Sequence, residues 1–157
     1  MARSVRSSTS RVKLDKFIKP MLATLTESRF DSKDWLFEIK WDGYRAIAEL
    51  SGKNVKLYSR NGISFLGLYP EIAGALSALN LRAVFDGEIV VLDDEGKSDF
   101  QNLQHIDESK GLSLIYYVFD LLRLNGKDLT SLPLLERKAR LRTILMQSGN
   151  TIRYRRR

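Results

Sequence analysis

The 157 residues are enough for one domain, and the 43% hydrophobic and 10% aromatic content supports a buried core, which excludes a wholly disordered chain. No apolar run approaches the roughly 18 residues of a membrane span, and the basic N-terminus lacks the apolar run of a secretory signal. Zero cysteines and one histidine, His105, exclude disulfide scaffolds and thiolate zinc sites and argue against a His-based triad. Together, these exclusions predict a soluble, cytoplasmic protein without a membrane partner.

The net charge of +7 is concentrated at the two ends of the chain. Residues 1–13 hold four cations without an acid, and residues 153–157 hold four arginines without an acid, which leaves 18 basic and 19 acidic residues between them. Basic tails bind phosphate backbones, but solvated flexible termini explain the same charge equally well. We expect a basic flexible segment over 1–16, a folded domain over 17–152 and a basic tail over 153–157.

The spacing of apolar residues predicts strands mixed with helices. Alternation and apolar runs predict strands over residues 35–41, 44–50, 55–60, 83–92, 112–122 and 151–154. Helical spacing predicts helices over residues 70–79, 100–106 and 134–146. The first three strands, joined by turns, form a predicted antiparallel meander. Because the order shows no strict βαβ alternation, the sequence favours an α+β class with antiparallel β-sheets flanked by helices.

The segment Glu-Ile-Lys-Trp-Asp-Gly-Tyr-Arg, residues 38–45, holds the most informative chemistry. In a strand, Glu38 and Lys40 project from one face beside a turn. A weak, exposed ion pair is the alternative reading.

Two more segments stand out, Asp86-Gly87-Glu88 and the aromatic run 116–122. Asp86 and Glu88 share one face of a strongly apolar strand, and buried carboxylates there require a cation, a metal or donor hydroxyls. The alternative is that this face is open to solvent. The aromatic run alone is more typical of a core than of a ligand platform, and His105 is expected to be a surface or capping residue.

Taken together, these segments resemble the nucleotidyltransferase superfamily of ATP-dependent DNA ligases, and look closest to the ligase module of bacterial LigD-type end-joining ligases. The resemblance extends in order over residues 17–145. It includes a Lys-x-Asp-Gly-x-Arg motif at 40–45, Pro-Met-Leu-Ala at 20–23, Ser-Arg-Asn-Gly at 59–62, Asp-Gly-Glu at 86–88 and Tyr-Val-Phe-Asp-Leu-Leu at 117–122. RNA ligases and capping enzymes share the lysine motif, but residues 35–45 and 116–122 favour a DNA ligase.

The resemblance implies an ATP-grasp-like adenylation domain that is incomplete on its C-terminal side. Lys40 would attack the α-phosphate of ATP to form lysyl-AMP, and the AMP would pass to the 5′-phosphate of nicked double-stranded DNA. Glu88 would also help place Mg²⁺ or Mn²⁺. The implied nucleotide contacts are Glu38 (adenine edge), Ile39, Arg45 (ribose or phosphates), Arg60 (nucleotide or DNA phosphates), Glu88 (ribose hydroxyl) and Phe119 (adenine face).

One difficulty leaves alternatives open. Lysine attacks only as a neutral amine, whereas neighbouring carboxylates favour its charged form, so activation requires a metal or more cations. The family carries these in downstream motifs that this sequence lacks, and the cationic helix 134–146 is not expected to replace them. Three alternatives to an autonomous ligase remain. The chain is one half of a split ligase completed by another ligase fragment, a non-catalytic nucleotide- or DNA-binding module, or a decayed fragment. The resemblance suggests a Ku-type partner, and an unpaired sheet edge predicts homo-oligomers.

Overall fold

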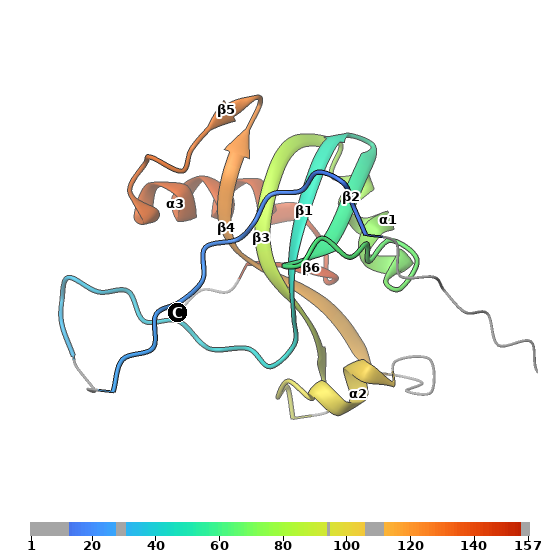
Figure 1. Cartoon of the computed structure of the whole chain (residues 1–157), viewed down its shortest axis with the longest axis horizontal. Helices are drawn as coiled ribbons and strands as arrows, with labels where there is room; N and C mark the ends of the chain where they lie inside the picture. The colour runs from blue at the N-terminus through green and yellow to red at the C-terminus, as the bar shows by residue number, and fades with distance from the viewer. Residues whose placement is uncertain (1–12, 28–30, 94, 106–111, 155–157) are drawn as a thin grey trace, which may run out of the picture.

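A single mixed sheet organises the protein. The computed structural model describes residues 13–27, 31–93, 95–105 and 112–154. Six strands form a sheet in the order β2-β1-β3-β4-β5, with β6 also paired to β4 (Figure 1). The elements are β1 Tyr44–Gly52, β2 Asn54–Ser59, α1 Pro70–Ala78, β3 Leu81–Leu92, α2 Phe100–Gln104, β4 Ser113–Leu124, β5 Lys127–Asp128, α3 Leu134–Ile144, a 3-10 turn η1 Leu145–Gln147 and β6 Ile152–Arg153.

Local sequence explains where these elements start and stop. Pro70 is the first residue of α1, where its missing N–H costs no hydrogen bond. Asn125 and Gly126, with φ values of 50° and 81°, form the two-residue connection between β4 and β5. Positive φ at both positions is what a tight hairpin turn requires, and Asn-Gly accepts it readily. The predicted turn between residues 44–50 and 55–60 is present as the connection from β1 to β2.

The two faces of the sheet have different roles. One face packs against α1 and α3 and forms the main core, which includes Ile72 and Leu76 of α1 and Leu141 of α3. On the opposite face, residues Leu14, Phe17 and Ile18 cover a small apolar cluster, and Figure 1 shows this early segment crossing in front of the strands. The same face carries the charged side chains of the candidate site and a third apolar cluster around Val90, Ile115 and Tyr117.

The predicted strand over 35–41 is wrong, because these residues have no strand pairing. Strand β1 pairs with β2 on one side and with β3 on the other, so no edge of β1 is left for the third strand of a meander. The side chains of Phe37 and Ile39 are each 54% exposed. The α+β class is confirmed, although β4 and β6 pair in parallel.

The remaining predicted elements match the observed ones closely. Helix α2 ends at Gln104, with the exposed His105 as its C-cap, as expected, and Ile106 lies outside the described residues. Residues 1–12 and 155–157 of the two predicted tails also lie outside them. Among the described residues, no helix is both long and apolar enough to cross a membrane.

Candidate active site

The register of β1 and β3 places Arg45 directly opposite Glu88. Asp86, two residues along the same strand, is diagonal to Arg45 and within reach of its long side chain. The Arg45 guanidinium makes a bidentate ion pair with Asp86, with Nε–Oδ1 at 2.6 Å and Nη2–Oδ2 at 2.7 Å. Asp86 is only 3% exposed, so the expectation that this buried carboxylate meets a cation is confirmed.

Phe119 reaches the same place through an irregularity in β4. The pairing of β3 with β4 passes from Asp120 to Val118 and leaves Phe119 without a partner in β3. Such a bulge redirects a side chain. The Phe119 ring lies under the Arg45 guanidinium, whose Cζ is 4.7 Å from the ring centroid. Arg45 therefore joins Asp86 and Phe119, from three strands, into one cluster.

Glu88 is the titratable group of this cluster. Burial, opposed by Arg45 and Lys40 and reinforced by Asp86 and Asp42, raises the pKa of Glu88 to about 7. Lys40 and Asp42 thus lie close enough to act on Glu88 electrostatically. A carboxyl group with this pKa exchanges its proton near neutral pH, so it can accept a hydrogen bond or bind a cation at little protonation cost.

The segment that carries Lys40 lies on the sheet although it is not a strand. The Trp41 indole stacks on Tyr117, with ring centroids 4.1 Å apart, and the Asp42 N–H donates to Ser98 Oγ at 3.1 Å. Gly43 follows, and a Cβ there would lie 2.8 Å from Val90 Cγ1 and still closer to the Ile89 carbonyl. Only glycine therefore lets the segment approach β3 this closely.

Helix α3 also contributes to the site, through Lys138, which was not among the predicted site residues. Lys138 Nζ lies 2.6 Å from Glu38 Oε1 and 2.7 Å from the carbonyl oxygen of Phe119. Its neighbour Arg137 makes a bidentate pair with Asp120, the partner of Asp86 across β3 and β4. One sequence feature indicates that Lys138 faces the sheet. Lys138 precedes the buried Leu141 by three residues and therefore lies on the same face of the helix.

Two predicted contacts stay apart from this cluster. The Ile39 side chain is exposed. Arg60 is exposed in the turn after β2, and within the described ranges no hydrogen bond or ion pair joins it to the cluster. Because Ser59 pairs with Ala46, Arg60 follows on the side of the sheet where Arg45 lies. The structure thus brings together Glu38, Arg45, Glu88 and Phe119, with Lys40 exposed beside them.

No group of three acidic or histidine side chains suited to a metal is found in the described part of the chain. Glu88 and Asp86 lie two residues apart, but both Asp86 oxygens are bound by Arg45. Of these two carboxylates, Glu88 is therefore the one whose oxygens are not bound by Arg45. Magnesium is commonly held by one or two carboxylates together with substrate phosphates, and this arrangement fits such a shared site.

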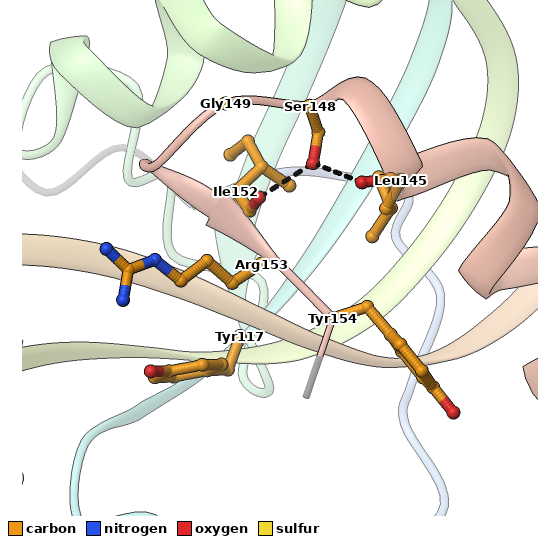
Figure 2. Close-up of a pocket in the computed structure, with 7 residues that line it drawn as sticks. All are labelled: Tyr117, Leu145, Ser148, Gly149, Ile152, Arg153 and Tyr154. Atoms are coloured by element: carbon orange, nitrogen blue, oxygen red, sulfur yellow. Dashed lines mark hydrogen bonds between the residues drawn. The ribbon is translucent and has the colours of Figure 1, made fainter. Parts of the chain in front are cut away.

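A separate hollow of about 420 Å³ lies between β4 and the turn that leads to β6 (Figure 2). The Ser148 hydroxyl lies 2.9 Å from the Leu145 carbonyl and 2.8 Å from the Ile152 carbonyl. Figure 2 shows Arg153 extending on the same side as Tyr117, with Tyr154 on the opposite side. Lys40, Arg45 and Glu88 do not line this hollow, so it is separate from the charged cluster.

The comparisons with known proteins agree with this geometry. The model of the ATP-dependent DNA ligase domain family matches residues 20–157. The multifunctional non-homologous end joining protein LigD of Pseudomonas aeruginosa is 39% identical over 148 residues, which cover 92% of this chain and 18% of that protein.

Solved structures show the same relationship. The ligase domain of Mycobacterium tuberculosis LigD superposes with a TM-score of 0.65 at 32% identity, covering 74% of this chain and 38% of that one. A mycobacterial DNA ligase D complexed with ATP and MES gives the same TM-score and identity, covering 73% of this chain and 38% of that one. The chain thus spans less than two fifths of each of these relatives. With the family match extending from Pro20 onward, the chain belongs to the ATP-dependent DNA ligase domain family.

Proposed function

We propose that this chain is the adenylation part of an ATP-dependent DNA ligase, with Lys40 as the residue that carries AMP. The Lys40 amine attacks the α-phosphorus of ATP, a nitrogen–phosphorus bond forms, and the bond to the β-phosphate oxygen breaks to release pyrophosphate. The proton of the amine is lost to solvent. The observation that carries this proposal is the convergence of Arg45, Glu88 and Phe119 on one face of the sheet beside Lys40.

The other side chains supply binding and orientation. The Phe119 ring offers an aromatic surface for adenine stacking. Glu38 presents a carboxylate, an acceptor for the exocyclic amino group of adenine. Arg45 is held in place by Asp86 and offers a cation to the ribose and phosphates, and Arg60 offers a second cation from the turn after β2. Glu88 accepts a hydrogen bond from a ribose hydroxyl. Ile39 stays a predicted apolar contact.

A divalent ion, Mg²⁺ or Mn²⁺, fits beside Glu88 when the nucleotide phosphates complete its coordination. When bound, it supplies positive charge that stabilises the developing charge on the phosphates. It also supports the neutral form of the nearby amine.

The experiment is intact-protein mass spectrometry after incubation with ATP and Mg²⁺. We expect an added mass of one AMP on the unchanged chain and none on Lys40→Ala. Lys40→Arg is the matched control, because it keeps the charge but not the nucleophile. ATP binding without a covalent adduct would instead support the non-catalytic nucleotide-binding alternative.

Transfer of AMP to nicked double-stranded DNA is the second part of the proposal. The relatives at 39% and 36% identity are named as non-homologous end joining proteins, which supports a DNA substrate, and a Ku-type protein stays a predicted partner. Because this chain spans a minor part of those relatives, sealing is to be measured on a nicked duplex with and without a complementing ligase fragment. A lysyl-AMP that discharges on nicked but not on intact duplex would support DNA as the acceptor.

A further inference from the structure

Lys138 is an unusual residue for the face of α3 that packs on the sheet. Its side chain is 7% exposed, although lysine is rarely buried without partners. An ammonium group removed from water must be paired and hydrogen-bonded to be tolerated. The two oxygen atoms that surround it are therefore informative about its role.

The first partner is the carboxylate of Glu38, 100 residues away in the sequence and 2.6 Å away in space. The Glu38 side chain is 48% exposed, so it is only partly covered. Lys138 binds Oε1, which leaves Oε2 available to an incoming group. Because Lys40 lies two residues further on, the same contact ties the segment of the nucleophile to α3.

The second partner is the carbonyl oxygen of Phe119, at 2.7 Å. Phe119 is the bulge residue of β4 without a partner in β3. A bulge leaves main-chain groups outside the regular ladder, and Lys138 satisfies one of them. One ammonium group thus fixes both the carboxylate and the bulge that presents the aromatic ring.

We infer that Lys138 is a positioning residue that sets the geometry and the base preference of the nucleotide site. This inference rests on the proposed function. Lys138 holds the Glu38 carboxylate in place, and a carboxylate offers only acceptor oxygens. Such a group accepts from the amino group of adenine but faces an acceptor, O6, on guanine. Without Lys138, both the Glu38 carboxylate and the Phe119 ring lose their fixed positions, and the preference for ATP over GTP weakens.

The anchoring part is tested without any nucleotide. The full chain is digested with limiting trypsin, and the rate of cleavage after Lys40 is divided by the rate of cleavage after Lys56. Lys56 lies in β2, so cleavage there requires the sheet to open. We expect Lys138→Met to raise the ratio of these two rates about fivefold or more, and Lys138→Arg to stay near the original ratio. Lys138→Gln, which can still donate to the Phe119 carbonyl, serves as a second variant if Lys138→Met does not fold.

Arg137→Met is the matched control, because it also removes an ion pair between α3 and β4 but has no contact with Glu38. We expect it to speed both cuts equally and to leave their ratio unchanged. If the Lys138→Met ratio equals that of Arg137→Met, the anchoring inference is overturned.

The base preference is then measured as the ratio of labelling rates with ATP and GTP. We expect this ratio to fall about tenfold in Lys138→Met and to be retained in Arg137→Met and largely restored by Lys138→Arg. An unchanged ratio in Lys138→Met overturns the role in base preference. If the unchanged chain is labelled by neither nucleotide, the proposed function fails, and the trypsin ratio alone decides the role of Lys138.

Discussion

Substituting Gly43 by alanine tests how closely the Lys40 segment approaches the sheet. An added Cβ would lie 2.8 Å from Val90 Cγ1 and 3.1 Å from Glu88 Cγ, and closest to the Ile89 carbonyl. Carbon atoms prefer separations of about 3.5–4.0 Å. The carbonyl belongs to β3, which is paired on both sides, at Tyr44 and Tyr116. The Lys40 segment therefore has to move, because the sheet is fixed.

The magnitude follows from the two interactions that this movement breaks. The Trp41–Tyr117 stack and the Asp42–Ser98 hydrogen bond are each worth about 1 kcal/mol. We expect Gly43→Ala to lower the free energy of unfolding by about 2 kcal/mol, within the range for overpacking. For a chain of this size, that corresponds to a fall in Tm of roughly 4–8 °C. Lysyl-AMP formation should fall with it, since Lys40 is displaced.

Gly74→Ala is the matched control, the same chemical change inside α1. A Cβ at Gly74 has nothing within 4 Å, and alanine costs less conformational entropy in a helix than glycine. We expect a gain of about 0.5–1 kcal/mol. Urea denaturation of both variants measures the expected loss of stability in Gly43→Ala and the expected gain in Gly74→Ala in one assay. Equal midpoints for Gly43→Ala and the unchanged chain would refute the reasoning about close approach.

Further substitutions probe the charged cluster and the aromatic ring. Asp86→Asn leaves the Arg45 guanidinium without its bidentate partner, and we expect a loss of about 3 kcal/mol, which an unchanged urea midpoint would contradict. Burial raises the pKa of Glu88 from 4.5 to about 7. The folded state therefore holds a proton that the unfolded chain releases, and this contribution to stability is lost as pH rises from about 4.5 through about 7. Glu88→Gln removes the effect, so its stability relative to the unchanged chain should rise across that window, whereas parallel pH profiles of the urea midpoint would disprove the assignment. Phe119→Leu should weaken ATP binding about tenfold because adenine stacking is removed, with little change in Tm, and equal affinity in a binding titration would argue against adenine at this ring.

The sequence predicted those elements whose apolar pattern matches their burial. Strands β3 and β4 are long and strongly apolar, and α1 begins at Pro70, so their positions agree within a few residues. The alternation over 35–41 was misleading, because alternation reports polarity and not the presence of a neighbouring strand. A strand requires a hydrogen-bonding partner, and both edges of β1 are already paired, with β2 and with β3.

Site prediction had the same limit. That Glu38, Arg45, Glu88 and Phe119 lie near one another could be predicted because they belong to local motifs. Lys138 was missed because its role depends on a contact with a residue 100 positions away, which no local pattern encodes. A cation on the apolar face of a helix was the only sequence signal, and it required a burial assignment to be recognised.

The wide separation of Glu38 and Lys138 has a consequence for the order of assembly during synthesis. Closing a loop of 100 residues costs roughly 0.8 kcal/mol more than closing the 41-residue loop between Arg45 and Asp86. As the chain leaves the ribosome, Asp86 emerges and can join Arg45 before α3 exists. The Lys40 segment is secured only after residue 138 has been made. A nascent chain can thus pair β1 with β3 before α3 fixes the Lys40 segment, whereas β6 joins β4 only after α3 has been made.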